Sequence, residues 1–403
     1  MRILLLTQIV PYPPDSGPKI KTYNVLRYLA QRHEIHLVSF ARSAAEREHA
    51  NALREYCRDI TIVPLRRSRL RDVGYLARSL VRGRPFLIER DDSITMRQVI
   101  RRLLDDHDFD AVHADQLSMG QFAVDLPIPL RVLDEHNAVW TIVRRAASRE
   151  GWGPRRLPAA LEWRKLRRYE GEICRHFDRV TVVSDEDRAA LVSASGTHLT
   201  TTTIPIAIDS QELSFQPRSP DARRILSVAT MFYPPNVEGV YWFAREVFPL
   251  VQQATPGAQF DVVGSRPPRK IARLGSPESG INVTGYVADL EPILRRSAVL
   301  VVPVHSGSGL RVKILEAFAR GIPVVSTRVG VEGIAARAGE HLLIADDPAG
   351  FAGAVSQVLH DRDLAARLAR AGRDLVEARY DWRTALADLE VVYPRASLPQ
   401  SST

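Results

Sequence analysis

VPVHSGSGLRVKILEAFARGIPVV, residues 302–325, is the most informative stretch of this chain. A short apolar strand at 299–302 runs into a Ser/Gly loop, and the loop opens a helix with apolar residues at i, i+4, i+7 and i+8. Gly321, with Pro323 beyond it, ends that helix. Unpaired backbone N–H groups and the positive end of the helix dipole meet at the helix start. Because anions bind at such places, the stretch predicts an anion site between a strand and a helix.

Arg311 and Lys313 stand in the first turn of this helix, where the dipole disfavours cations by roughly 0.3–1 kcal/mol each. A bound anion reverses that sign, so two cations at this place indicate a diphosphate site. Glu316 lies about one turn deeper on the same face and can accept hydrogen bonds from ribose hydroxyls. A solvated helix face with an ion pair between Lys313 and Glu316 is the alternative for this segment alone.

The segment resembles the signature of the retaining glycosyltransferases of family 4 (group 1), which have the two-domain GT-B fold. That signature has two Glu residues separated by seven positions, followed by Ala, a small residue, Gly and Pro-Val-Val. Glu316 stands at the second Glu, and Ser308 stands at the first. The resemblance implies that Ser308, Gly309 and Leu310 grip the donor sugar largely through main-chain N–H groups.

The resemblance also suggests which residues bind the nucleobase. Gly264, after the strand at 260–263, and the run of Gly285, Tyr286 and Val287 look like the close backbone approach and base-edge contacts of the family. Backbone recognition of this kind fits uracil or guanine. Ordinary strand-end turns are the alternative interpretation.

Strand and helix patterns alternate twice along the chain, which predicts two doubly wound parallel sheets. The fold class is therefore α/β of the GT-B type, with two Rossmann-like domains facing a cleft between them. We predict an acceptor domain at 1–205, a linker at 206–222 and a nucleotide-sugar domain at 223–375. A C-terminal helix at 376–393 is expected to cross back to the first domain, and a tail follows at 394–403.

Two loops of the first domain are candidate site elements. Gly17 precedes a helix and resembles the family's Gly-Gly loop, with Pro18 in place of the second Gly and Lys19 as a compensating cation for an acceptor or phosphate. His136 follows the strand ending near 133, and in the family a His at this place contacts the donor sugar and its phosphates. Asp134 or Glu135 could orient its imidazole or bind an acceptor hydroxyl, and a helix N-cap is the alternative for either residue.

Composition and charge indicate the number of domains, the cellular compartment and the kind of partner. With 403 residues, 45% of them hydrophobic, and two cysteines, the chain suits two domains in a reducing cytoplasm. Residues 1–205 carry 33 Lys and Arg against 26 Asp and Glu, which is +7 of the total +8. Arginines alternate with apolar residues over 66–84. This pattern favours an anionic membrane surface, here the inner face of the cell membrane, and a solvated arginine-rich helix face is the alternative. No motif for nucleic acid accompanies the charge.

The resemblance to family 4 implies a retaining hexosyltransferase that uses a UDP- or GDP-sugar, and we expect it to need neither a metal nor a cofactor. His136, Arg311 and Lys313 are its predicted catalytic residues. The acceptor would be a sugar, a lipid-linked molecule or a small molecule, in surface polysaccharide, lipopolysaccharide or glycolipid biosynthesis. A nucleotide-sugar epimerase and a non-catalytic GT-B partner protein are the alternatives. No Gly-x-Gly-x-x-Gly follows the first strand of either domain, which disfavours a dinucleotide dehydrogenase.

Overall fold

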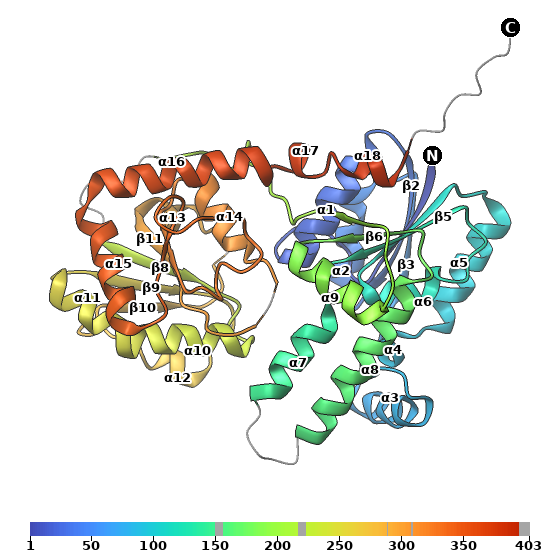
Figure 1. Ribbon diagram of the computed structural model, residues 1–403, viewed down its shortest axis with the longest axis horizontal. Helices are drawn as coiled ribbons and strands as arrows, with labels where there is room; N and C mark the ends of the chain where they lie inside the picture. Colours follow the sequence, from blue (N-terminus) through green and yellow to red (C-terminus); the bar gives the residue numbers. More distant parts are fainter. Residues whose placement is uncertain (150–155, 217–222, 288, 308, 395–403) are drawn as a thin grey trace, which may run out of the picture. The chain divides into compact units, whose positions relative to one another are not determined.

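The computed structural model describes residues 1–149, 156–216, 223–287, 289–307 and 309–394. The chain forms two compact units (Figure 1). One comprises Met1–Ala207 together with Ala385–Thr403, and the other comprises Ile208–Thr384. The chain therefore leaves the first unit once and returns to it near its C-terminus.

A seven-stranded parallel sheet forms the centre of the first unit, in the order β3-β2-β1-β4-β5-β6-β7. Its inner strands are almost continuously apolar because a parallel sheet is covered by helices on both faces. The strands are β1 (Arg2–Thr7), β2 (Glu34–Ala41), β3 (Asp59–Pro64), β4 (Ala111–Asp115), β5 (Leu130–Glu135), β6 (Arg179–Val182) and β7 (Thr201–Thr203). The apolar runs of the sequence at 3–6, 36–40, 60–63, 111–113, 131–133 and 180–183 predict all but β7, whose three threonines form no apolar run.

Helices cover both faces of this sheet (Figure 1). The helices of this unit are α1 (Gly17–Ala30), α2 (Ala44–His49), the 3-10 turn η1 (Ala50–Leu53), α3 (Arg69–Arg82), α4 (Phe86–Asp91), α5 (Ile94–Asp106), α6 (Leu117–Ala123), α7 (Val139–Arg149), α8 (Arg156–Cys174), α9 (Asp185–Ser195) and α18 (Leu389–Val392). Tyr393, just after α18, is buried and its hydroxyl lies 2.6 Å from Nδ1 of His113 on β4. The returning C-terminal segment thus becomes part of the first unit's interior.

The second unit has a six-stranded parallel sheet in the order β10-β9-β8-β11-β12-β13. Its strands are β8 (Arg224–Val228), β9 (Gln259–Val263), β10 (Ile281–Thr284), β11 (Ser297–Val302), β12 (Val324–Ser326) and β13 (Leu343–Ile344). The apolar runs of the sequence predict all six, at 225–229, 260–263, 281–284, 299–302, 324–326 and 341–344. Their buried side chains pack with those of the helices into one hydrophobic core.

The helices of this unit are α10 (Pro234–Trp242), the π-helical turn η2 (Phe243–Val247), α11 (Phe248–Ala254), α12 (Arg269–Ala272), α13 (Glu291–Arg296), α14 (Val312–Ala319), α15 (Pro348–His360), α16 (Arg362–Arg379) and α17 (Trp382–Ala385). The C-terminal helix expected at 376–393 is divided, because α16 ends at Arg379 and a turn at 386–388 separates α17 from α18. Among the described residues, no helix combines the length and the apolar content that spanning a bilayer requires.

Candidate functional site

The loop between β11 and α14 has the conformation that its glycines permit. Gly307 and Gly309 have φ values of +97° and +87°, in the left-handed region that residues with a side chain rarely adopt. A Cβ on Gly307 would lie 2.6 Å from the hydroxyl of Tyr233. The helix begins at Val312 with Arg311 as its N-cap residue, two positions later than the apolar pattern suggested. Ser308 lies outside the described residues.

Two cations flank the start of α14. The guanidinium of Arg311 donates hydrogen bonds to the backbone carbonyls of Gly309 and Ser306, the second at 3.4 Å. Lys313 forms no ion pair with any residue that the structure describes, so the alternative of a Lys313–Glu316 surface pair is not what the fold makes. Burial and the charge of Arg311 lower the pKa of Lys313 to about 7, although Glu316 opposes the shift. The ammonium is thus held where its positive charge is poorly compensated.

Glu316 stands on the same helix, one turn after Lys313, in a partly buried position. Burial raises the pKa of its carboxyl, while Arg320 and Lys313 partly offset that rise. A carboxyl group in this setting gains from hydroxyl donors, because they stabilise its charged form. The start of α14 therefore carries two cations followed by a partly buried carboxylate, and their roles as diphosphate and ribose ligands stay predictions. Leu310, which precedes Arg311, is 9% exposed and so offers mainly its backbone.

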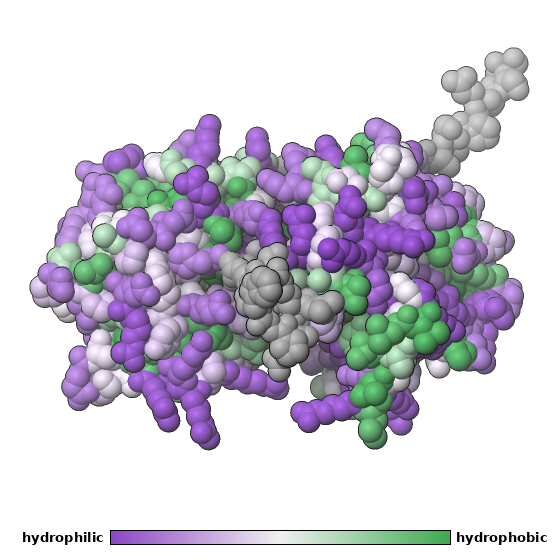
Figure 2. Space-filling view, turned by 60° about the horizontal axis from the view of Figure 1, so that its bottom comes forward, coloured by the Kyte–Doolittle hydropathy of each residue, from purple (hydrophilic) through white to green (hydrophobic). Residues whose placement is uncertain are grey.

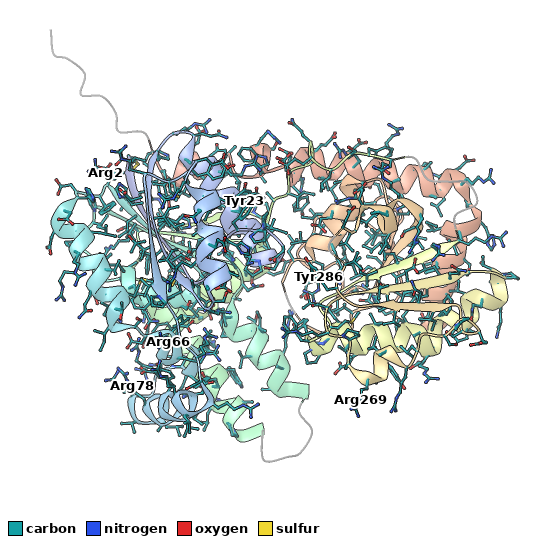
Figure 3. All side chains as sticks on the ribbon, turned by 180° about the vertical axis from the view of Figure 1, so that it is seen from behind. Arg2, Tyr23, Arg66, Arg78, Arg269 and Tyr286 are labelled. Carbon is teal, nitrogen blue, oxygen red and sulfur yellow. The ribbon has the colours of Figure 1, made fainter. Side chains whose placement is uncertain are left out.

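The predicted nucleobase residues differ in their surroundings. Gly264 follows β9, and a Cβ there would lie 1.8 Å from the carbonyl oxygen of Ala229. Packing within the protein therefore already requires a glycine at that position. Gly285 has open space around it, and Tyr286, labelled in Figure 3, is 79% exposed, while Val287 is half-buried. The base-contacting role of these four residues stays a prediction.

In the first unit, His136 lies directly after β5 and is buried. Its Nε2 is 3.0 Å from Oδ1 of Asp115, at the end of β4, and 3.6 Å from Oδ2 of Asp134. Burial alone would lower the pKa of the imidazole, but the charge of Asp115 and the hydrogen bonds to Asp115 and Asp134 together make the net shift upward. Its Nδ1 is buried and has no hydrogen-bond partner among the described residues. One ring nitrogen is therefore fixed by a carboxylate, and the other is unused.

A buried lysine that the sequence analysis missed completes this group. The ammonium of Lys21, on α1, forms an ion pair with Oδ1 of Asp134, and both side chains are 1% exposed. Thr181 on β6 donates to the same oxygen at 2.5 Å. Although burial acts in the opposite direction, Lys21 and the nearby histidines hold the pKa of Asp134 well below its usual range. Lys21 shares a helix face with Val25 and Leu29 at i+4 and i+8, and that spacing could have revealed its burial.

Glu135 does not orient the imidazole, because successive side chains of a strand point to opposite faces. The carboxylate of Asp134 lies next to the imidazole of His136. Glu135 is buried on the opposite face of the strand, and neither of its carboxyl oxygens has a hydrogen-bond partner among the described residues. Burial, followed by the charge of Glu170 on α8, raises the pKa of Glu135 well above its usual range. Of the two candidates, only Asp134 can position the ring.

The Gly17 loop is less available than expected for an anion. Gly17 begins α1 after Ser16, whose side chain makes no capping hydrogen bond. Lys19 forms an ion pair with Asp15 at 3.0 Å. The ammonium of Lys19 therefore already has a carboxylate partner, and its role as a compensating phosphate ligand stays a prediction that needs this pair to open.

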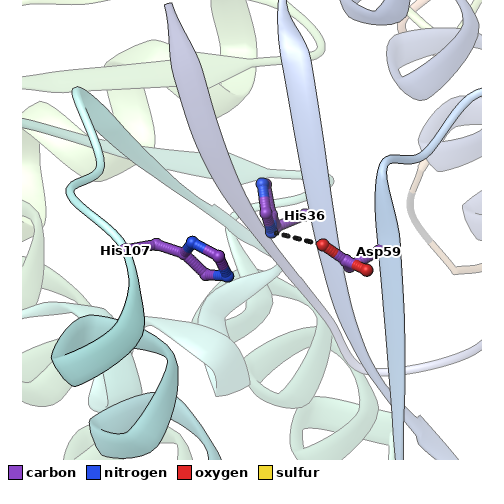
Figure 4. A group of neighbouring side chains, drawn as sticks. All are labelled: His36, Asp59 and His107. Atoms are coloured by element: carbon purple, nitrogen blue, oxygen red, sulfur yellow. Dashed lines mark ion pairs between the residues drawn. The ribbon is translucent and has the colours of Figure 1, made fainter.

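Two groups of described residues have side chains close enough to hold a metal ion. His113, Asp115 and Asp134 form the first, and there the ammonium of Lys21 already neutralises Asp134. The second comprises His36, Asp59 and His107, shown in Figure 4, where Nδ1 of His36 lies 3.4 Å from Oδ2 of Asp59. His36 and Asp59 stand near the N-terminal ends of β2 and β3, at the opposite sheet edge from His136, and His107 directly follows α5. The second group is therefore separate from the predicted site.

Comparisons with known proteins agree on one class. Residues 222–361 match the family model described as Glycosyl transferases group 1, and residues 17–212 match the one described as Glycosyltransferase Family 4. The chain is 36% identical over 110 residues to a lipopolysaccharide core biosynthesis glycosyltransferase, LpsE, of Rhizobium meliloti, covering 27% of this chain and 32% of that protein. It is 34% identical over 152 residues to a D-inositol 3-phosphate glycosyltransferase of Acidothermus cellulolyticus, covering 37% and 33%. It spans about a third to a half of the length of the curated relatives it matches.

A solved structure covers nearly the whole chain. Anabaena HepE in complex with UDP superposes with a TM-score of 0.68 at 15% sequence identity, covering 98% of this chain and 99% of that chain. At this level of identity, the likeness establishes the fold.

Proposed function

We propose, since the chain belongs to the glycosyltransferases of group 1 and family 4 and has their GT-B fold, that it transfers a sugar from a nucleotide diphosphate sugar to an acceptor hydroxyl. The observation that carries this proposal is the start of α14. There Arg311 and Lys313 lie at the positive end of a helix, and the pKa of Lys313 is lowered to about 7. Two cations held in this way favour a ligand with two negative charges close together.

The donor in this proposal is a UDP- or GDP-sugar. Its diphosphate lies at Arg311 and Lys313, its ribose at Glu316, and its sugar against the backbone of Gly309 and Leu310. The UDP complex of HepE supports a uridine nucleotide for that protein, and we carry the same base over to this chain as the first to be tested.

The chemistry follows from the charges that develop in the reaction. Breaking the bond between the anomeric carbon and the diphosphate leaves positive charge on the sugar and negative charge on the leaving group. The N-terminus of α14, Arg311 and Lys313 stabilise the leaving diphosphate electrostatically, which is the role a metal ion plays in other transferases. We therefore propose transfer that does not depend on a divalent metal.

His136 is the proposed sugar-facing residue. Asp115 fixes its Nε2, so the unused Nδ1 is the nitrogen that can contact a donor hydroxyl or phosphate. Of the described carboxylates that contact His136, Asp134 is already paired with Lys21 and Asp115 with His136 itself, so neither is placed as a nucleophile. We propose that the acceptor attacks from the face that the diphosphate leaves and that the leaving phosphate takes its proton. The product then retains the anomeric configuration.

The acceptor class rests on the relatives. LpsE acts in lipopolysaccharide core biosynthesis, and this supports a saccharide or lipid-linked acceptor of a surface polysaccharide or glycolipid, reached at the inner face of the cell membrane.

The direct test is nucleotide release from UDP- and GDP-sugars with a panel of saccharide and lipid-linked acceptors. Acceptor-dependent release, lost in Lys313→Ala and His136→Ala, supports transfer, and NMR of the product reports its anomeric configuration. Conversion of the donor without an acceptor would instead indicate an epimerase. Tight nucleotide binding with no turnover on any acceptor would favour a non-catalytic partner protein.

A further inference from the structure

Helix α3 presents its apolar side to solvent, which is the reverse of an ordinary surface helix. Its exposed fractions are Leu70 87%, Val73 67%, Leu76 49%, Leu80 63% and Val81 87%. These five positions fall within one stripe of less than half the helix circumference, since each residue advances the helix by about 100°. Hydrophobic side chains gather at the lower right of Figure 2, on the face that carries α3.

Polar contacts hold the opposite side of α3 against the protein. The only side chain of α3 that is fully buried among those described is Ser79, whose hydroxyl donates to the carbonyl of Arg84 at 2.7 Å. Lys165 on α8 donates to the same hydroxyl at 2.7 Å. Arg78, labelled in Figure 3, pairs with the buried Glu89 of α4 at 3.0 Å. The helix is thus fixed by its polar face, and its apolar face is left outward.

The arginines of this region divide into two sets. Arg67, Arg78, Arg82 and Arg84 pair with the acidic residues of α4 and the position after it, so they are structural anchors rather than a solvated charge layer. Arg66, Arg69 and Arg71 are exposed, and their side chains form no ion pair with any residue that the structure describes. These three lie at the N-terminal end of α3 beside the apolar stripe.

An apolar stripe beside arginines without ion-pair partners is complementary to a surface with anionic groups outside and apolar groups just beneath them. We infer that α3 docks the first unit onto an anionic lipid membrane, with Leu70, Leu80 and Val81 entering the acyl region and the N-terminal arginines meeting lipid phosphates. A second copy of the chain fits less well, because in a symmetric contact the same surface is its own partner and brings further arginines rather than the negative charge that these arginines lack. The inference goes beyond the proposed function, since a membrane holds the chain whether or not a sugar is transferred.

The test is binding of the whole chain to lipid vesicles, measured by flotation. Vesicles of phosphatidylcholine mixed with phosphatidylglycerol are compared with vesicles of phosphatidylcholine alone. The wild-type chain should bind the anionic vesicles far more tightly. The triple variant Leu70→Ser, Leu80→Ser, Val81→Ser should lose about a thousandfold in vesicle affinity, at roughly tenfold for each apolar side chain withdrawn from lipid. Replacing Arg66, Arg69 and Arg71 by Gln should cost roughly fivefold for each arginine.

Ile94→Ser is the matched control, because Ile94 is 76% exposed in the same unit but lies on α5. It should bind vesicles as the wild type does, and all variants should keep wild-type nucleotide binding, which separates this inference from the proposed function. Failure of the wild type to bind anionic vesicles would overturn the inference. So would an equal loss in Ile94→Ser, or sedimentation showing a wild-type dimer that the triple variant disrupts without any vesicle binding.

Discussion

The affinity for a nucleoside diphosphate should fall as pH rises above 7, because the ligand binds the charged form of Lys313. In the free protein the pKa of this ammonium is lowered to about 7 by burial and by Arg311. A diphosphate supplies the missing negative charge and returns the pKa toward the ordinary value of 10.5. Between these two values, binding takes up a proton. The affinity should therefore drop by up to about tenfold, or about 1.4 kcal/mol, for each pH unit.

Calorimetric titration with UDP at pH 7, 8 and 9 measures this effect. UDP is essentially fully ionised over that range, since the second phosphate pKa is about 6, so the change reports on the protein. Repeating the titration at pH 8 in buffers of different ionisation enthalpy should reveal uptake of about 0.9 proton per ligand. Lys313→Arg is the control, because its guanidinium remains charged and its affinity should not vary. A wild-type affinity that is constant from pH 7 to 9, or an equal fall in Lys313→Arg, would refute the reasoning.

Three further perturbations test other parts of the account. Lys21→Met leaves the buried carboxylate of Asp134 without its counter-ion and should lower the free energy of unfolding by about 3–5 kcal/mol in denaturant titration, with partial recovery when Asp134→Asn is added. Gly264→Ala places a Cβ against the carbonyl of Ala229 and should cost about 1–3 kcal/mol of stability even without nucleotide, whereas an unchanged melting temperature would contradict the packing argument. Asp115→Asn weakens the hold on Nε2 of His136 and should lower kcat more than it changes KM for the donor; equal effects on both would argue against a positioning role.

Much of the fold was accessible from the sequence because parallel strands are buried on both faces and appear as apolar runs. Residues 3–6 and 299–302 are examples that became β1 and β11. β7 was missed because Thr201–Thr203 is short and polar, and its strand conformation depends on pairing with β6. The division of the C-terminal helical pattern into α17 and α18 was also missed, since both have the same helical spacing on either side of a turn.

The candidate site was predicted unevenly, for a physical reason. The order of Arg311, Lys313 and Glu316 follows from local helix geometry, so spacing along the chain was enough. The surroundings of His136 combine residues from α1, β4 and β5. No local pattern indicates that Lys21 would form an ion pair with Asp134, which lies beside His136. The arginines at 66–84 likewise could not be separated into anchors and free charges, because their acidic partners belong to another helix.

Titration of UDP, GDP and ADP into the wild-type chain, Lys313→Ala and Glu316→Ala, with and without magnesium, tests the central claim most directly. The account predicts that one nucleotide binds the wild type equally well without magnesium, and that both substitutions weaken its binding by at least about tenfold, or 1.4 kcal/mol. If no nucleotide binds, or if both variants bind it as well as the wild type does, the start of α14 is not the donor site.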